Sequence, residues 1–169
     1  MRHCLKRIPA LLPLLLVTAP ASAQTPGSAF IDDRSSAERV IISLYNAVNR
    51  QEYLRAWNYY DPQTAPKLDE FKAGYANTVE VVVRTGEVES EGAAGSIHLS
   101  LPVAIKATEK GGKTAVFTGC YRLTQVQPAN QEVPPFRPIQ IDTGALEPTD
   151  APFESAMGTC SAKIEKPVN

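Results

Sequence analysis

Three features of the sequence predict an α+β fold. Apolar residues recur every three or four positions between residues 37 and 73, which is the spacing of one face of a helix. From residue 78 onward they alternate with polar residues, as in strands that have one buried face. A Gly111-Gly112 pair separates the two longest alternating segments and indicates a tight antiparallel hairpin. N-terminal helices are therefore expected to pack on the apolar face of a curved antiparallel sheet.

The first 23 residues have the pattern of a signal peptide. Three basic residues occupy the first seven positions, an apolar run follows, and residues 21–23 read Ala-Ser-Ala, the small-residue pattern that signal peptidase cleaves. Prolines interrupt the short apolar run, which favours cleavage over a retained membrane anchor. We therefore expect an exported protein, periplasmic or secreted, that begins at Gln24 and keeps no stable membrane span.

One domain is expected over residues 31–164, with a flexible leader at residues 24–30 and a frayed tail at residues 165–169. The chain has 169 residues, with 17 Lys and Arg against 18 Asp and Glu, for a net charge of -1. Cleavage would remove three basic residues and no acidic residue, which moves the net charge to about -4. Nucleic-acid-binding domains usually carry a basic surface, so this charge argues against that class.

The first helix is expected to run to about Arg50. Ser35 and Glu38 have the spacing of a capping box, in which the serine hydroxyl accepts a hydrogen bond from the Glu38 backbone N–H. The apolar residues of this helix share one face: Ala37, Val40, Ile41, Leu44, Ala47 and Val48. A second helix fits Glu52–Tyr60, and a third fits Pro66–Ala73.

Four strands are expected, at Thr78–Thr85, Ser96–Thr108, Thr114–Gln127 and Arg137–Ala145. In the second strand, the odd-numbered apolar residues point toward the helices, and His98 points the other way. Apolar residues on the outward face are candidates for a homodimer contact: Val82, Ala104, Val116 and Val126. Residues 128–138 hold four prolines and are expected to form a surface loop.

Two cysteines remain after cleavage, and in an exported chain they predict a disulfide. Cys120 and Cys160 would close a loop of about 40 residues and attach the C-terminal segment to a strand. Their spacing matches no metal-binding motif, and no motif of the sequence calls for a metal or a cofactor. Residues 92–95 are expected to be a flexible turn, and the acidic residues before them a solvated edge rather than a cation site: Glu87, Glu89 and Glu91.

Two segments resemble the nuclear transport factor 2-like superfamily. Residues 40–57 resemble its opening, in which a first helix ends in an Asn-x-x-acidic-Tyr turn and leads into an Ala-Trp helix. Residues 71–78 are similar to the helix-to-strand passage of exported bacterial members, and residues 119–123 look like their central strand. The resemblance spans residues 35–145. It implies a cone-shaped half-barrel with a pocket between sheet and helices.

The resemblance also implies where a ligand would bind. Five aromatic residues are the candidates for the pocket, with core filling as the alternative role: Trp57, Tyr60, Tyr75, Phe117 and Tyr121. Enzymes of the superfamily carry an acid–base pair there, often Asp with His or Tyr. Such a pair cannot be carried over to this sequence. The acidic candidates lie at helix ends or on polar faces (Asp32, Asp33, Asp61, Asp69 and Glu70), and no evident partner orients His98.

The sequence therefore favours an exported, non-catalytic binding domain. Its concave apolar pocket would take a small apolar ligand or an envelope partner. Two alternatives stay open at this stage: an isomerase or hydro-lyase that uses the same pocket, and a structural homodimer that pairs through the sheet.

Overall fold

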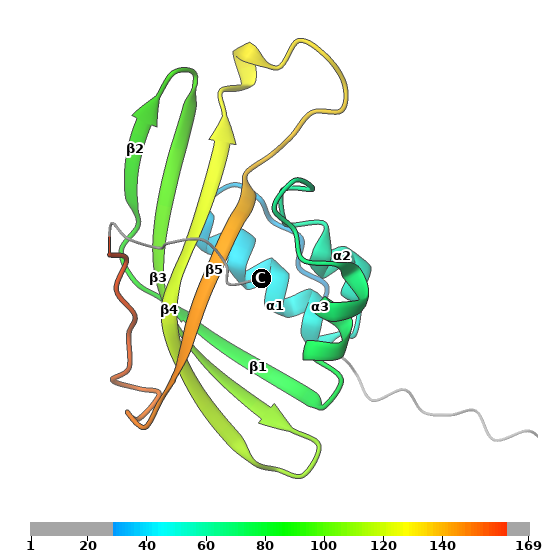
Figure 1. Cartoon of the computed structure of the whole chain (residues 1–169), viewed down its shortest axis with the longest axis vertical. Helices are drawn as coiled ribbons and strands as arrows, with labels where there is room; N and C mark the ends of the chain where they lie inside the picture. The colour runs from blue at the N-terminus through cyan, green and yellow to red at the C-terminus, as the bar shows by residue number, and fades with distance from the viewer. Residues whose placement is uncertain (1–28, 162–169) are drawn as a thin grey trace, which may run out of the picture.

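The computed structural model describes residues 29–161 and confirms the predicted fold class. Three helices lie on one face of a curved five-stranded antiparallel sheet, and the sheet bends around them as a cone-shaped half-barrel (Figure 1). The expected signal peptide and the expected tail at residues 165–169 lie outside the described residues. So does most of the expected leader, although the carbonyl of Ala29 accepts a hydrogen bond from the Asn46 side chain.

Helix α1 (Ala37–Asn49) provides most of the helical contribution to the core. Its apolar face is buried, with Val40, Ile41, Leu44 and Ala47 each 0 % exposed. The sequence suggested Ser35 as the capping residue, but the residue that caps the helix is Ser36. Ser36 has extended backbone angles and its hydroxyl accepts from the Arg39 N–H at 3.3 Å. Ser35 instead donates its N–H to the Asp33 carboxylate, which leaves the next residue to begin the helix.

Helices α2 (Tyr53–Trp57) and α3 (Leu68–Gly74) are shorter than the periodicity suggested. The chain leaves α2 early because its next residues pair with the edge of the sheet. Tyr60 bridges Ile141, and the Asp61 N–H donates to the Ile141 carbonyl at 2.9 Å. This tertiary pairing satisfies backbone groups that a longer helix would otherwise have bonded internally.

The sheet contains strands β1 (Thr78–Thr85), β2 (Glu89–Ala93), β3 (Ser96–Glu109), β4 (Thr114–Val126) and β5 (Gln140–Thr149). The main order is β1-β3-β4-β5, and β2 also pairs with β3. Strand β2 includes residues of the segment expected to be a turn and a solvated edge. It forms because β1 pairs with β3 only from Val103 onward, so the first half of β3 needs a partner on the edge away from β4. The change of partner falls at Pro102, which has no N–H to donate.

Strand β5 begins later and ends later than predicted. The segment before it belongs to the proline-rich loop, where Gln131 holds the backbone of Arg137 through two hydrogen bonds of 2.7 and 2.9 Å. Beyond Ala145, the strand continues through Pro148 because Val116 to Gly119 of β4 still need a partner. The proline is tolerated since β5 is an edge strand of the main order.

The inward face of the sheet forms one core with the helices. Leu101, Val103 and Ile105 of β3 are at most 3 % exposed and pack with Leu123 of β4 and with α1. The predicted alternation along β3 is therefore confirmed. His98 lies on the outward face and is exposed, as expected.

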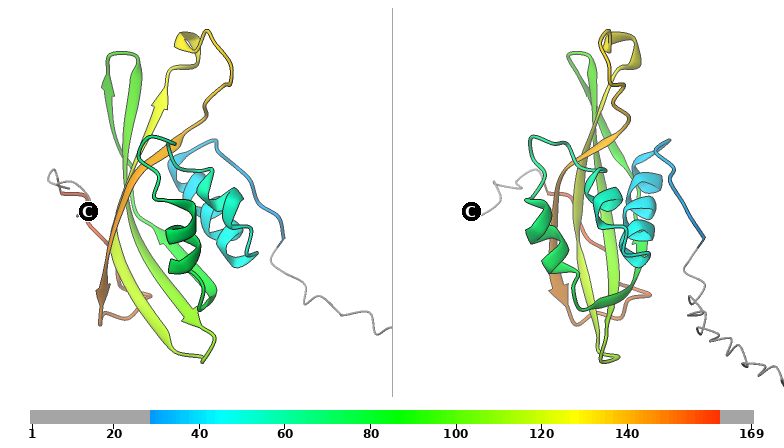
Figure 2. Two further views of the ribbon diagram at one scale, coloured as in Figure 1. Left: turned by 45° about the vertical axis from the view of Figure 1, so that its right-hand side comes forward. Right: turned by 90° about the vertical axis from the view of Figure 1, so that its right-hand side faces the viewer.

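The outward face is covered in part by the chain's own C-terminal segment, residues 153–160, which we call the strap. Figures 1 and 2 show the strap on the side of the sheet away from the helices. Phe153 and Ala156 bury Ala104, which is 0 % exposed, and Val116 packs against the same group. Two of the four residues considered for a homodimer contact, Ala104 and Val116, thus pack against the strap. Val82, another of the four, is 36 % exposed.

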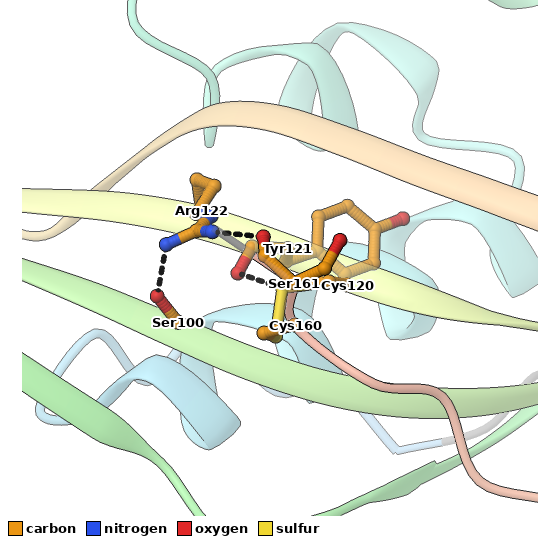
Figure 3. Close-up of a disulfide and its surroundings, with 6 residues drawn as sticks. All are labelled: Ser100, Cys120, Tyr121, Arg122, Cys160 and Ser161. Atoms are coloured by element: carbon orange, nitrogen blue, oxygen red, sulfur yellow. Dashed lines mark hydrogen bonds between the residues drawn. A yellow bond between two sulfur atoms is a disulfide. The ribbon is translucent and has the colours of Figure 1, made fainter. Parts of the chain in front are cut away.

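Two kinds of contact fasten the strap. The Arg84 guanidinium donates to the carbonyl oxygens of Phe153 and Glu154 at 2.6 and 2.5 Å. At the far end, Cys160 forms a disulfide with Cys120 of β4, as predicted. Arg122 adds a hydrogen bond of 2.7 Å to the Ser161 carbonyl beside it (Figure 3).

Candidate functional site

A pocket of about 430 Å³ opens between α3 and the sheet. Its walls are largely apolar and come from all four strands of the main order: Val81, Ile105, Ala107, Ala115, Phe117 and Leu146. They face it because the odd-numbered residues of β3 and β4 point toward the helices, where the bent sheet leaves space beside α3. A pocket of this size and lining can hold a small molecule with an apolar body.

Tyrosine residues lie in and beside the pocket. Tyr45 of α1 and Tyr75, which follows α3, both contribute to the lining. The Tyr45 hydroxyl lies 2.6 Å from the hydroxyl of Tyr121, and both side chains are buried. Tyr60 contacts the Tyr121 hydroxyl, and Tyr75 contacts the Tyr45 hydroxyl, so the four tyrosines form one connected cluster.

The rings of this cluster are held by Phe71 and by a glycine. Phe71 of α3 packs edge-on against Tyr60 and Tyr75, with ring centroids 5.9 and 5.1 Å apart. Gly144 of β5 lies opposite Tyr121, and a β-carbon at Gly144 would overlap the Tyr121 ring. The sheet register and the missing side chain together give Tyr121 the room to turn its hydroxyl toward Tyr45.

Burial keeps the tyrosine cluster uncharged. Loss of hydration raises the pKa of Tyr45 and Tyr121 well above the ordinary value, and the neighbouring tyrosines raise it further. Burial likewise raises the pKa of Tyr60 and Tyr75. At neutral pH the four hydroxyls can donate and accept hydrogen bonds, but they are poor general bases.

Alkaline pH is expected to destabilise the fold through this cluster. Above about pH 10 the unfolded tyrosines lose protons while the buried ones keep theirs. The folded state then binds more protons than the unfolded state, so the free energy of unfolding falls by about 1.4 kcal/mol per pH unit for each such tyrosine. Below pH 10 the tyrosines are protonated in both states, and their contribution to stability does not change with pH.

Urea titrations at pH 8 and at about pH 11 would measure this loss of stability. Tyr45→Phe should make the pH slope shallower. Tyrosinate absorbance from all four residues before unfolding would contradict the assignment.

The five aromatic residues proposed from the sequence divide into three groups. Tyr75 and Phe117 line the pocket, while Tyr60 and Tyr121 join it through the hydroxyl cluster. Trp57 is not among the lining residues, because its indole N–H donates to the Pro66 carbonyl at 2.7 Å and turns the ring toward the loop before α3. Sequence reasoning missed Tyr45. Its position four residues after Ile41 and three before Val48 is the signal that places it on the buried face of the helix.

His98 has a partner that the sequence did not reveal. Its Nδ1 lies 2.9 Å from the Thr124 hydroxyl, which donates to the Asp142 carboxylate at 2.7 Å. Asp142 is the extra residue of a β-bulge, which turns its side chain to the outward face. Burial raises the pKa of Asp142. This array lies on the opposite face of the sheet from the pocket, so it cannot act on a ligand there.

The acidic residues weighed from the sequence lie outside the pocket lining. Asp32 accepts from the Tyr59 hydroxyl at 2.7 Å, and Asp33 and Asp61 accept from backbone N–H groups of their own turns. The lining holds one carboxylate, that of Glu109, at the end of β3. Over residues 29–161, no group of three or more His, Cys, Asp or Glu side chains is placed to hold a metal ion.

The fold and this pocket define an α+β protein whose sheet and helices line an open pocket of small-molecule size. Its fold is similar to the crystal structure of a protein from Novosphingobium aromaticivorans, provisionally assigned as an aromatic ring hydroxylase, which has a nuclear transport factor 2-like fold. The TM-score is 0.51 at 14 % sequence identity, and the match covers 69 % of this chain and 93 % of the other. No family model and no curated protein matches the sequence.

Proposed function

We propose that this protein is an exported binding domain of the nuclear transport factor 2-like type, whose pocket takes a small ligand with an apolar body. The observation that carries the proposal is the cavity of about 430 Å³, which has largely apolar walls and two tyrosines, Tyr45 and Tyr75, in its lining. The match to a solved structure supports the fold type. The ligand would gain free energy by burying apolar surface, and the hydroxyls would orient its polar group.

Two observations support export. The first is the signal-peptide pattern of residues 1–23, which lies outside the described part of the chain. The second is the disulfide between Cys120 and Cys160, a bond that persists mainly in oxidising compartments. Within residues 29–161, no helix is both long and apolar enough to cross a bilayer.

Binding is proposed in preference to catalysis because of the groups that face the pocket. An acid–base enzyme of isomerase or hydro-lyase type would need a group of shifted pKa that can take a proton near neutral pH. The buried titratable groups of this pocket are tyrosines, and burial moves their pKa upward, away from neutrality. Pairing through the sheet is likewise not preferred, since the strap already covers Ala104.

Filling the pocket is expected to weaken ligand binding strongly while leaving the fold intact. Ala107 of β3 lines the pocket and is only partly buried, so Ala107→Leu would extend its side chain into the cavity. We expect 3-phenyl-1-propanol, an uncharged apolar probe, to bind the wild-type chain with 1:1 stoichiometry. Binding to the variant should be at least tenfold weaker by isothermal titration calorimetry.

The matched control is Ala129→Leu, which makes the same change at an exposed position of the 3-10 turn at Pro128–Asn130. It should bind the probe as the wild type does. Equal affinity of all three chains for the probe would place binding elsewhere and overturn the proposal. So would the absence of saturable binding to the wild-type chain.

A further inference from the structure

Glu109 continues the inward-facing row of β3 as a carboxylate. This row reads Leu101, Val103, Ile105, Ala107 and then Glu109, because alternate residues of a strand share one face. Glu109 contributes to the pocket lining with Ala107 and is exposed, so it lies at the outer rim. Its backbone is held by pairing with Thr78 of β1 and by the N–H bond to the Lys113 carbonyl.

The Glu109 carboxylate is not neutralised by any residue that the structure describes. Among residues 29–161, no ion pair and no side-chain hydrogen bond involves it. Lys110 and Lys113 of the adjacent hairpin are exposed, and neither lines the pocket. Lys106, three residues before Glu109, lies over the Phe153 ring on the outward face of the sheet. The carboxylate is therefore available to a group that enters at the rim.

The rest of the pocket offers nothing that would hold an anion by charge. Within residues 29–161, its lining contains no Lys, Arg or His. The tyrosine hydroxyls are neutral at pH 7, and burial raises their pKa further from neutrality. The aromatic faces of Phe117 and Tyr75 attract cations rather than anions. A carboxylate ligand would meet like charge at the rim, whereas a protonated amine would meet opposite charge.

We propose that the pocket selects apolar ligands that carry a protonated amine, with Glu109 at the rim as the residue that determines this selectivity. The inference rests on the proposed binding function and adds the ligand class to it. The apolar body would lie against Ile105 and Phe117, and the ammonium group would remain near Glu109 at the solvent-facing end. Keeping the charge at the rim avoids the cost of burying it.

Three probes of nearly equal shape test the proposal: 3-phenylpropylamine, 3-phenyl-1-propanol and 3-phenylpropanoate. Titrations by calorimetry would use the chain with its disulfide intact, at pH 7 and low ionic strength. We expect the amine to bind about tenfold more tightly than the carboxylate, with the alcohol between them, because a rim charge contributes attraction to one probe and repulsion to the other. The difference should shrink in about 0.3 M salt.

Glu109→Gln should remove the preference and bring the amine to the affinity of the alcohol. Glu80→Gln is the matched control, since Glu80 is an exposed carboxylate of the neighbouring strand that does not line the pocket. It should leave the order of the three probes unchanged.

The outcomes separate this inference from the proposed function. Binding of the alcohol in the pocket without discrimination between amine and carboxylate would overturn the ligand class and leave the binding function standing. A preference for the amine that persists in Glu109→Gln would overturn the role of Glu109. Failure of all three probes to bind the wild-type chain would overturn both the binding function and the ligand class.

Discussion

Replacing both Cys120 and Cys160 with alanine is expected to lower the free energy of unfolding by about 4 kcal/mol. The disulfide closes a segment of 40 residues, and in the chain-entropy model a cross-link of that span removes about this much conformational freedom from the unfolded chain. The helices and the sheet should persist, because their core lies on the other face of the sheet. Far-ultraviolet circular dichroism during urea unfolding would measure the shift.

The same variant should also release the strap. Without the disulfide, the Arg84 contacts and the burial of Phe153 remain as its main attachments. Glu154 is exposed within the strap, so a glutamate-specific protease should cut there faster in the variant. Wild-type protein treated with reductant is the matched sample. An unchanged unfolding midpoint in both samples, together with unchanged proteolysis, would contradict the structural role of the disulfide.

Gly119→Ala is expected to destabilise the protein by about 3 kcal/mol, the upper end of the usual cost of overpacking. A β-carbon at Gly119 would overlap the carbonyl oxygen of Ala145 on β5. The backbone cannot move away on its outward side, because Gly158 of the strap packs directly against Gly119 there. Denaturant unfolding would measure the loss, and weaker protection of β5 amides from hydrogen exchange should accompany it.

Gly92→Ala provides the matched control, since it makes the same change in a strand. A β-carbon at Gly92 would have no atom within 4 Å, so we expect stability to stay the same or to rise by about 0.5 kcal/mol. Equal effects of the two substitutions would show that glycine flexibility, and not close packing, explains the presence of Gly119.

The strap changes how the outward face of the sheet should be understood. The sequence marked Ala104 and Val116 as apolar residues that need a cover, and a second copy of the chain was one way to supply it. The structure covers them with Phe153 and Ala156 of the same chain. Intramolecular burial costs no translational entropy, whereas pairing of two chains does. This difference favours a chain that covers this part of its sheet by itself.

Much of the fold could be predicted from local periodicity. The apolar face of α1 and the alternation along β3 and β4 are properties of neighbouring residues, because the helical and strand periods decide which side chains share a face. The hairpin between β3 and β4 follows from Gly111-Gly112 for the same local reason. Export context and cysteine count predicted the disulfide, which the structure contains.

Strand β2 and the limits of β5 could not be predicted in this way. Glu89–Ala93 has no apolar alternation, and it becomes a strand only because β1 leaves the first half of β3 unpaired on the edge away from β4. Strand β5 extends through Pro148 because β4 needs pairing along that edge. In both cases the backbone hydrogen bonds of a distant strand decide the outcome, and local propensity is overridden.

Only some of the residues that line the pocket could be predicted from the sequence. Tyr75 and Phe117 line the pocket, and Trp57 does not, since its indole finds a hydrogen-bond acceptor at Pro66. The contact between Tyr45 and Tyr121 joins residues that are 76 positions apart, so no sequence spacing reveals it. The partners of His98 were hidden for the same reason, and the bulge that turns Asp142 to the outward face exists only within the assembled sheet.

The sequence by itself therefore determined which side chains face the core, the long hairpin of the sheet and the pairing of its two cysteines. These depend on periodicity and on chemical type, which are local properties. Only the tertiary structure decided that the strap crosses the outward face and that four tyrosines meet beside a cavity with Glu109 at its rim. Those arrangements depend on how far the sheet bends and on where distant segments meet, and they are set by packing and hydrogen bonding across the whole fold.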